Sequence, residues 1–582
     1  MSDPVPLPPS LRKRFYEPVI LLAALRGVYR QDESLVEPDL EGDTGKSPKQ
    51  VYFCFLNKLS QICDSQKKQD FGKTVSAIVV LQPGSIEYRL ASNRRDSGEL
   101  ATATEYLADI LNVLGHVTDG QINDRAFMAT VSSDILRKVL GFNRPRIEVY
   151  LEELVEANQL DFCIESATTS ETPDGRSVAE ALSSLRPHLK AARGASRLNN
   201  DEFVRHAEAL LQTIDLHYVP TLEDYMKQKT RGDNNVVDSP WNDIRHALGR
   251  LLSYFIAIKV LISARKYWPR LFVDFEVTSI PSSEPQPDPP DIRRNAAGII
   301  SRMSRSKEIA NAYQSHAEHL QSFKLDDGIR KRVKADYFRP IVHAEVNLLA
   351  SVLASQAAAE REGEDPLRFF HEADFGAYIG SSKPTCLLCR QYFAAHPARV
   401  GCRESHGNLY VNWRAPDVVR EEGPVVAKER CDILEAMVKE VRKEATRAIL
   451  NRSYTRRKHD SWDTPTNPLW STAVGGSLGR GGGEDELVSQ LGQVNLDGRR
   501  SVRSGLDMTS VRSGGRVPGR ARGVDLASTM GQVNLDTSSM RAWSDDSRET
   551  TPRARRIIEE DEEDEDEEED DEDGEDGGGV KL

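Results

Sequence analysis

One histidine and two cysteines stand at positions from which they could bind a single metal ion. His343 follows Pro340 at the start of an apolar segment, and proline favours the first turn of a helix. Further along the chain, Pro384 precedes Cys386 and Cys389 at another predicted helix start. Two thiolates and one imidazole would leave a zinc ion one open coordination position, as in catalytic zinc sites.

The spacing of the two cysteines supports metal binding. Cys386 and Cys389 are three residues apart, so they project from the same side of a helix turn, where the helix dipole stabilises thiolates. The chain has seven cysteines, most of them isolated, which does not suit a disulfide framework. Cys402 and His406 are near enough in sequence to supply a fourth ligand, and such a closed site would be structural rather than catalytic.

The tripeptide His-Ala-Glu occurs three times, at residues 206–208, 316–318 and 343–345. We expect the first two copies to lie in the middle of amphipathic helices, and only His343 to begin a helix. Glu345 lies roughly 200° around the helix from His343, so it is poorly placed to bind the same ion. It is placed instead to hold a proton of the bound water, which is the role of glutamate in the His-x-Glu and Pro-Cys-x-x-Cys signature of zinc deaminases.

Three segments resemble the OTT deaminase-like proteins, a largely fungal branch of the cytidine deaminase superfamily that is related to toxin-type nucleic acid deaminases. They are residues 341–349, 378–389 and 405–413. The resemblance implies a three-layer α-β-α core with zinc as the cofactor. It also implies a hydrolytic reaction in which zinc-bound hydroxide attacks a ring carbon of a nucleobase, Glu345 shuttles protons and ammonia leaves.

The same resemblance implies a substrate-binding residue outside the metal motif. Asn93 is similar to the asparagine that contacts a nucleoside sugar in the superfamily, and we take His406 as a second candidate for substrate binding. Tyr410 and Trp413 are candidates for stacking a base, although core packing is the commoner role of such aromatic residues. Thr385 departs from the wider superfamily pattern, because it separates the proline from the first cysteine, and this would shift the substrate pocket.

The first 280 residues are predicted to be mainly helical, with one β-hairpin at residues 74–91. Pro83 and Gly84 suit a type II turn at its centre. A hairpin precedes the zinc helix in the superfamily, so this one is expected to complete the deaminase sheet. Apolar residues at three-to-four spacing predict the helices, over residues 100–117, 125–139, 147–158, 178–192, 202–214 and 241–267.

The zinc-binding core is predicted to span residues 296–452. A proline-rich segment at residues 281–295 precedes it and is either a linker or a long surface loop. The order of helices and strands predicts the α/β class. The predicted elements are strands at residues 271–277, 376–380 and 409–413, and helices at residues 305–322, 343–355, 384–395 and 429–452.

The composition predicts a disordered C-terminal tail at residues 453–582. The chain has a net charge of −14, 38% hydrophobic residues and a mean hydropathy of −0.52, which is too polar for folding throughout its 582 residues. The charged part of the tail is either a nucleic-acid contact masked by an acidic mimic or a solvated polyampholyte. The tail holds a repeated Gly-Gln-Val-Asn-Leu-Asp motif for docking protein partners (492–497 and 531–536), a basic segment (499–522) and an acidic run (559–576).

Three classes of function follow. The first is a zinc-dependent hydrolase that deaminates a nucleobase of a nucleotide or nucleic acid, and the presence of Glu345 favours it. The second is a catalytically silent, zinc-stabilised binding module, and the third is a helical scaffold whose tail recruits partners. No apolar stretch reaches the roughly 20 residues of a membrane span, so we expect a cytosolic or nuclear protein without a membrane segment.

Overall fold

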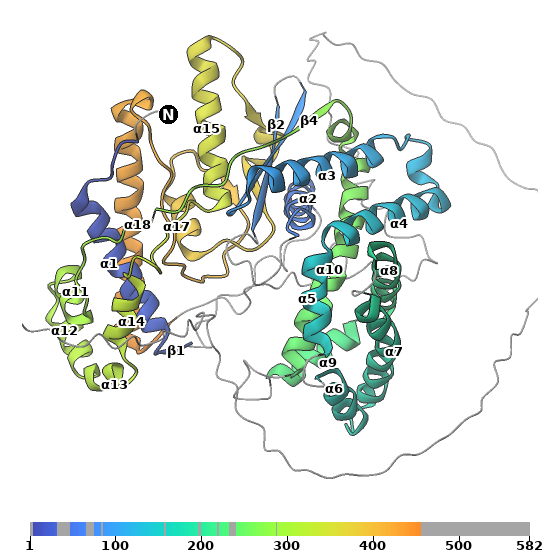
Figure 1. Cartoon of the computed structure of the whole chain (residues 1–582), viewed down its shortest axis with the longest axis horizontal. Helices are drawn as coiled ribbons and strands as arrows, with labels where there is room; N and C mark the ends of the chain where they lie inside the picture. Colours follow the sequence, from blue (N-terminus) through green and yellow to red (C-terminus); the bar gives the residue numbers. More distant parts are fainter. Residues whose placement is uncertain are drawn as a thin grey trace, which may run out of the picture. The chain divides into compact units, whose positions relative to one another are not determined.

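The computed structural model describes residues 4–31, 47–65, 75–82, 85–155, 159–195, 199–217, 220–231, 240–286 and 288–454 (Figure 1). These residues belong to a compact unit that spans Met1–Gln493, and the second unit, Val494–Leu582, lies outside the described residues. This part of the chain is mixed α/β, with mostly helices and one small mixed sheet. The predicted turn at Pro83 and Gly84 and the predicted tail from residue 455 onward also lie outside the described residues.

The sheet is built around the predicted hairpin. Its two strands pair antiparallel, and the first of them also pairs antiparallel with the strand that leads to the two cysteines. The hairpin and the C-terminal metal motif therefore share one sheet. The strands, in the order β4-β3-β2-β6-β7 with β5 beside β2, are β2 (Ser76–Gln82), β3 (Ile86–Ser92), β4 (Phe275–Ser279), β5 (Arg368–Phe369), β6 (Tyr378–Ser381) and β7 (Gly401–Cys402).

Helices pack against both faces of this sheet. Successive side chains of β2 point to opposite faces, so Ile78 and Val80 enter one hydrophobic core while Ala77 and Val79 enter the other. Burial on both faces explains why this strand is a continuous apolar run. The helices on the first face are α2 (Pro48–Ile62) and α3 (Ser97–Gly115), and the main helix on the second face is α15 (Ala344–Glu362).

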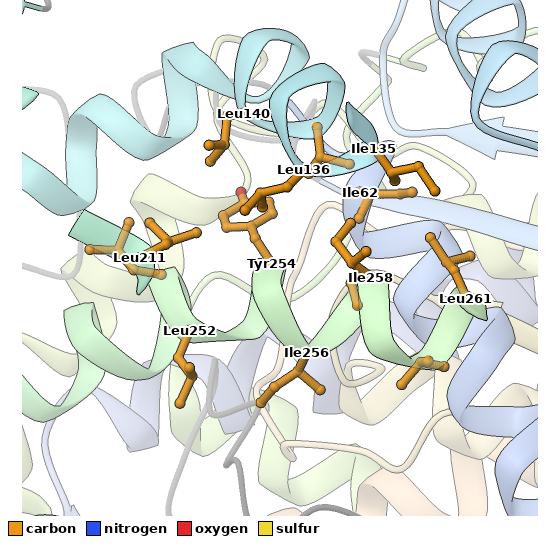
Figure 2. Packing of buried hydrophobic residues seen from close by; sticks show 14 of the residues in the cluster. Ile62, Ile135, Leu136, Leu140, Leu211, Leu252, Tyr254, Ile256, Ile258 and Leu261 are labelled. Atoms are coloured by element: carbon orange, nitrogen blue, oxygen red, sulfur yellow. The ribbon is translucent and has the colours of Figure 1, made fainter. Parts of the chain in front are cut away.

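A long apolar helix, α10 (Pro240–Tyr267), forms the centre of the helical region. Its residues Tyr254 and Ile258 belong to the same core as Ile62 and Leu136 (Figure 2). The prediction that no apolar stretch is long enough to span a membrane is wrong for α10, which alone among the described helices has the length and composition of a span. However, 78% of its apolar window is buried inside the protein, as in the core helix of a soluble protein. Packed against it are α4 (Arg125–Phe142), α5 (Arg144–Val155), α6 (Gln159–Thr168), α8 (Asn200–His217) and α9 (Pro220–Arg231), and α7 (Pro173–Ala195) packs against α6 and α8.

The helices predicted before residue 280 are present as α3, α4, α5, α7, α8 and α10, whereas α2, α6 and α9 were not predicted. The strand predicted from residue 271 starts later, because Pro269–Phe272 form a 3-10 turn before β4. In the second half, the helix predicted from residue 429 is α18 (Gly423–Asn451), which begins earlier and packs along α1 (Pro9–Arg26). The predicted folded core ends at residue 452, but the next two residues form β8 (Ser453–Tyr454), which pairs with β1 (Arg30–Gln31).

Two predictions in the second half are wrong. The segment 409–413 is no strand, because its backbone pairs with the rest of the protein only through a single bridge from Trp413 to Ile341. Its side chains alternate between buried and exposed because one side of the segment packs against the protein, although no neighbouring strand pairs with it. The helix predicted over 305–322 is divided, and His316 is the N-cap of the second piece, so His343 is not the only helix-start histidine. The elements here are α11 (Ala296–Met303), α12 (Lys307–Gln314), α13 (Ala317–Ser322) and α14 (Leu325–Arg332).

The proline-rich segment is a surface loop that is fixed against the backbone leading to His343. Ser283 Oγ donates to the Val342 carbonyl at 3.1 Å and accepts from the Val342 N–H at 2.8 Å. Gln286 N donates to the Pro340 carbonyl at 3.1 Å. Because backbone groups and a short hydroxyl side chain make these bonds, the loop holds the backbone of Val342, the residue before His343, in place.

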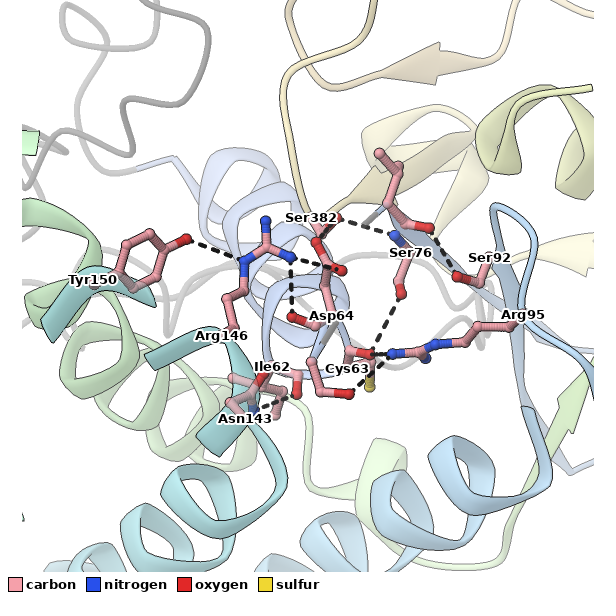
Figure 3. A network of polar contacts seen from close by, with 12 residues as sticks. Ile62, Cys63, Asp64, Ser76, Ser92, Arg95, Asn143, Arg146, Tyr150 and Ser382 are labelled. Carbon is pink, nitrogen blue, oxygen red and sulfur yellow. Dashed lines mark hydrogen bonds and ion pairs between the residues drawn. The ribbon is translucent and has the colours of Figure 1, made fainter. Parts of the chain in front are cut away.

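A buried polar network joins the end of α2 to the loop after β6 (Figure 3). Asp64 Oδ1 lies 3.0 Å from Arg146 Nη1, and Ser382 Oγ donates to Asp64 Oδ2 at 3.0 Å. The same hydroxyl accepts from Ser76 N at 3.0 Å. Ser382 is thereby held between the hairpin and the helical region, and it fixes the backbone that runs on to Cys386.

Candidate metal centre

His343 occupies the N-cap of α15, one residue before the helix begins. Its backbone is extended, with φ −67° and ψ 152°, and its carbonyl accepts from Asn347 N at 2.8 Å. The next residue, Ala344, donates its N–H to Asn93 Oδ1 at 2.8 Å. A side chain from the end of β3 thus satisfies one of the free amides of the first turn. The hairpin and α15 together hold His343 in place.

Cys386 and Cys389 meet His343 at the start of α17 (Leu387–Ala395). Cys386 is the N-cap of this helix, and the Cys389 N–H donates to Cys386 Sγ at 3.3 Å. The distance from His343 Nδ1 is 3.6 Å to Cys386 Sγ and 3.4 Å to Cys389 Sγ. All three ligand atoms lie within 4.8 Å of one another. Two helix N-termini from separate parts of the chain therefore converge on one point.

Burial and the charges of their neighbours shift the pKa values of these three side chains. Burial raises the pKa of Cys389, and its neighbour Cys386 raises it further. Burial would also raise the pKa of Cys386, but a hydrogen bond with Cys389 and the charge of His343 outweigh it, so the pKa falls well below its usual value. Burial lowers the pKa of His343, whereas the charge of Cys386 outweighs this and raises it. A cation between the sulfurs would stabilise both thiolates at once.

Glu345 lies in the first turn of α15 and is 3% exposed. Ser381 Oγ, from the end of β6, donates to Glu345 Oε1 at 3.0 Å. The other oxygen, Oε2, is buried and has no hydrogen-bond partner among the described residues. Burial raises the pKa of Glu345 against the opposing charge of His343. A buried carboxyl oxygen that lacks a partner is a place for a water molecule or a substrate proton.

The residues present fit a zinc ion. Two sulfurs and one imidazole nitrogen form the soft donor set that zinc favours, whereas magnesium and calcium require oxygen ligands. Within the described ranges, the cluster contains only His343, Cys386 and Cys389, so neither Cys402 nor His406 joins it as a fourth ligand. A closed site with four protein ligands is therefore not formed, and Glu345 lies beside the cluster rather than in it.

Asn93 lies next to the cluster but makes a contact that the sequence did not predict. It is 5% exposed, and its Oδ1 is occupied by the bond to Ala344 N. The structure thus adds a helix-capping role to this residue, and its contact with a sugar stays a prediction.

His406 is outside the cluster, but it lies near the ring of Tyr410, which also lies near His343. It is buried, and its Nδ1 accepts from Asn408 N at 2.9 Å. Tyr410 connects the two histidines, since its ring centroid is 6.1 Å from that of His406 and 6.1 Å from that of His343. Tyr410 is 46% exposed, whereas Trp413 is fully buried against aromatic rings of α1 and α17. Trp413 therefore belongs to the core, and the stacking of a base on Tyr410 stays a prediction.

Sequence reasoning missed Ser381 and Ser283, which hold Glu345 and the backbone before His343. Ser381 lies within the resembling segment 378–389 but was given no role, and Ser283 lies outside the resembling segments. Each makes its contact from an element distant in sequence, so no local pattern indicated the contact.

Fold and site define this chain as a mixed α/β protein with a candidate metal centre made of one imidazole and two thiols. The OTT_1508-like deaminase family model matches residues 342–417, a segment that contains His343, Glu345, Cys386 and Cys389. The match confirms the resemblance to OTT-type deaminase-like proteins that the sequence motifs indicated, and this segment is a deaminase-like part of the chain. No curated protein and no solved structure matches the chain.

Proposed function

We propose that this protein is a zinc-dependent hydrolase that removes the exocyclic amine from a nucleobase of a nucleotide or nucleic acid. One observation carries the proposal: the buried Glu345, with one oxygen held by Ser381 and the other without a partner, lies beside the convergent His343, Cys386 and Cys389. The deaminase family match over residues 342–417 supports the same class of reaction.

The side chains divide the work of this reaction. His343, Cys386 and Cys389 hold the zinc ion, which supplies a Lewis acid when bound. Glu345 Oε2 takes a proton from the attacking water and returns it to the leaving nitrogen. Ser381 keeps the carboxyl in one orientation through Oε1. The raised pKa of Glu345 brings this carboxyl closer to neutral pH, where proton transfer in both directions is most effective.

The bonds and protons balance in this scheme. The water oxygen forms a bond to the ring carbon, and the bond from that carbon to the exocyclic nitrogen breaks. Ammonia leaves, and the base carries a carbonyl in place of its amine. Because Glu345 and both cysteines are buried, bulk water does not compete for the carboxyl oxygen that moves the proton.

Mass spectrometry of reaction products tests the proposal. The full-length protein is incubated with separate pools of nucleosides, nucleotides and single-stranded RNA or DNA, and we expect an amine-to-carbonyl conversion in at least one pool. Chelation of zinc should abolish the conversion, and added zinc should restore it. Cys386→Ala should be inactive, while Cys431→Ala, a cysteine of α18 outside the metal cluster, should be active.

Two results would contradict the proposal. If no pool is converted by metal-loaded protein, the chain is not a nucleobase deaminase, and the zinc-stabilised binding module takes its place. Conversion that persists in Cys386→Ala would instead show that the reaction does not depend on this cluster.

A further inference from the structure

Two arginines lie beside the candidate metal centre without an acidic partner. Arg94 follows Asn93, whose side chain caps α15, and Arg339 lies four residues before His343. In the described part of the chain, neither guanidinium forms an ion pair or a side-chain hydrogen bond. Arg94 is half-buried, whereas Arg339 is exposed. Other half-buried or buried arginines have acidic partners, for example Arg89 with Glu87. The half-buried guanidinium of Arg94 is therefore not explained by the packing of the fold.

Arg94 also has an unusual conformation. Its φ is 59°, in the left-handed region that residues with a side chain rarely adopt. Its Nε atom is buried and has no hydrogen-bond partner among the described residues. Other described arginines show one of these two features, but Arg94 combines both, and the combination makes it a candidate for binding a ligand.

Hydrogen bonds of neighbouring groups place both arginines near the cluster. The residue before Arg94, Asn93, accepts from the N–H of Ala344, and the backbone N–H of Arg339 donates to Asn412 Oδ1 at 2.8 Å, two residues after Tyr410. Burial lowers the pKa of Arg94, and the charge of Arg339 lowers it further. Two like charges at such a place repel each other, and an anion bound between them would relieve that repulsion.

An exposed aromatic ring also lies close to His343. Tyr410 is 46% exposed, and its ring centroid lies 6.1 Å from that of His343. Aromatic rings next to cationic groups are the combination that binds a nucleotide unit, because the ring stacks on the base and the cations hold the phosphate. Arginine suits this role, since its planar guanidinium donates two hydrogen bonds to one phosphate.

We propose that Arg94 and Arg339 bind a phosphate of the substrate, so that the site takes a phosphate-bearing nucleotide unit in preference to a free nucleoside or base. This inference rests on the proposed function, because it names the substrate class of the same site. The phosphate belongs either to a mononucleotide or to a single strand, and the two sources share this chemistry.

Equilibrium binding to the full-length protein tests the role of the phosphate. The probes are cytidine with CMP, adenosine with AMP, and short single strands of the same two bases. For at least one base, we expect the phosphate-bearing probe to bind about tenfold more tightly than its nucleoside, as for one charge-assisted hydrogen-bond pair. Arg94→Gly and Arg339→Ala should each remove most of this preference and leave nucleoside affinity unchanged.

The variants are chosen to separate binding from folding. Glycine accepts a positive φ, so Arg94→Gly removes the guanidinium without straining the backbone. Arg94→Lys retains the charge and should keep part of the preference. Arg399→Gly is the matched control, because Arg399 also has a positive φ (50°) but lies beyond the other end of α17, away from Cys386. It should leave the binding of every probe unchanged.

Each outcome decides the question. Tight binding of CMP or AMP assigns the phosphate to a mononucleotide, and tight binding of single strands alone assigns it to nucleic acid. Equal affinity for phosphate-bearing and phosphate-free probes overturns the proposal, as does unchanged affinity in both arginine variants. Because binding needs no turnover, a protein that prefers CMP through Arg94 yet deaminates nothing keeps the phosphate site and loses the proposed function. A protein that deaminates free cytidine and ignores phosphate loses only the phosphate site.

Discussion

Asn93 accepts, through Oδ1, a hydrogen bond of 2.8 Å from the backbone N–H of Ala344, a residue 251 positions later in the chain. The bond joins the end of the N-terminal hairpin to the residue directly after His343. The helices from α3 to α10 are therefore inserted between two parts of one site. This arrangement makes the metal site dependent on a residue that is not a ligand.

Removing the Asn93 cap should weaken the metal site. Asn93→Ala leaves the Ala344 N–H without its acceptor, so the unfolding free energy should fall by about 1 kcal/mol and zinc should be lost to a chelator more readily. Asn93→Asp keeps an oxygen acceptor at the same place and should retain zinc nearly as well as the native protein. Chelator competition and denaturant unfolding measure the two effects. Native-like zinc retention in Asn93→Ala would show that the cap does not position His343.

The purified protein should contain about one zinc ion per chain, as the three-ligand site requires. His343→Ala and Cys386→Ala should lose this zinc, because each removes one of only three donors. The matched controls are His206→Ala and His316→Ala, which alter the other two His-Ala-Glu tripeptides. Elemental analysis of the five proteins decides the assignment, and unchanged zinc in Cys386→Ala would refute it.

Breaking the buried ion pair between Arg146 and Asp64 should lower the unfolding free energy strongly. Arg146→Ala leaves the Asp64 carboxylate, which is 3% exposed, without its cation, and should lower the unfolding free energy by about 3–5 kcal/mol. Arg144→Ala is the control in the same helix. It breaks a more exposed pair with Glu148 and a cation–π contact with Phe203 at 5.0 Å, and should cost about 1–2 kcal/mol. Equal losses in the two variants would show that the network in Figure 3 does not stabilise the fold.

Stability in acid should depend on Glu87 of β3. Burial raises the pKa of this carboxyl, but hydrogen bonds from Arg89 and Thr278 outweigh it, so the pKa lies below its usual value. The bonds therefore add stability above the unfolded pKa of about 4.3, and this contribution is lost as the pH falls through the folded pKa. Glu87→Gln should be less stable at neutral pH by about 1 kcal/mol.

The comparison with Glu87→Gln is made by denaturant unfolding at neutral and acidic pH. The variant should show a smaller loss of stability than the native protein below about pH 4.3, since it has no carboxyl to protonate at this position. Identical acid dependence in the two proteins would contradict the assignment. The effect matters for the site because Arg89 also donates to Ser355 Oγ of α15 at 2.9 Å.

The metal cluster could be predicted from the sequence because its signals are local. Cys386 and Cys389 are three residues apart, and His343 follows a proline at a helix entry, so both helix starts could be read without the fold. The hairpin was equally local, and its two strands pair antiparallel as expected, although the register places Ile78 opposite Leu90 and not opposite Arg89 as the predicted turn requires. Only the meeting of these parts needed three-dimensional information.

Contacts across the chain could not be predicted in this way. The cap from Asn93, the bond from Ser381 and the position of Arg94 depend on strand pairing between β2 and β6, which no local pattern records. The strand predicted at residues 409–413 failed for a related reason. Val411 and Trp413 are buried and Tyr410 is exposed, as alternation predicts, yet the sheet has no neighbouring strand there.

The central claim is that Glu345 moves protons while other residues hold the zinc. The most direct measurement is turnover per bound zinc, for the native protein and for Glu345→Gln, on the substrate identified by mass spectrometry. The amide keeps the shape of the side chain but cannot take up the proton, so zinc content and melting temperature should be unchanged and turnover should fall by about 10²–10⁴-fold. Equal turnover per zinc in the two proteins would contradict the claim.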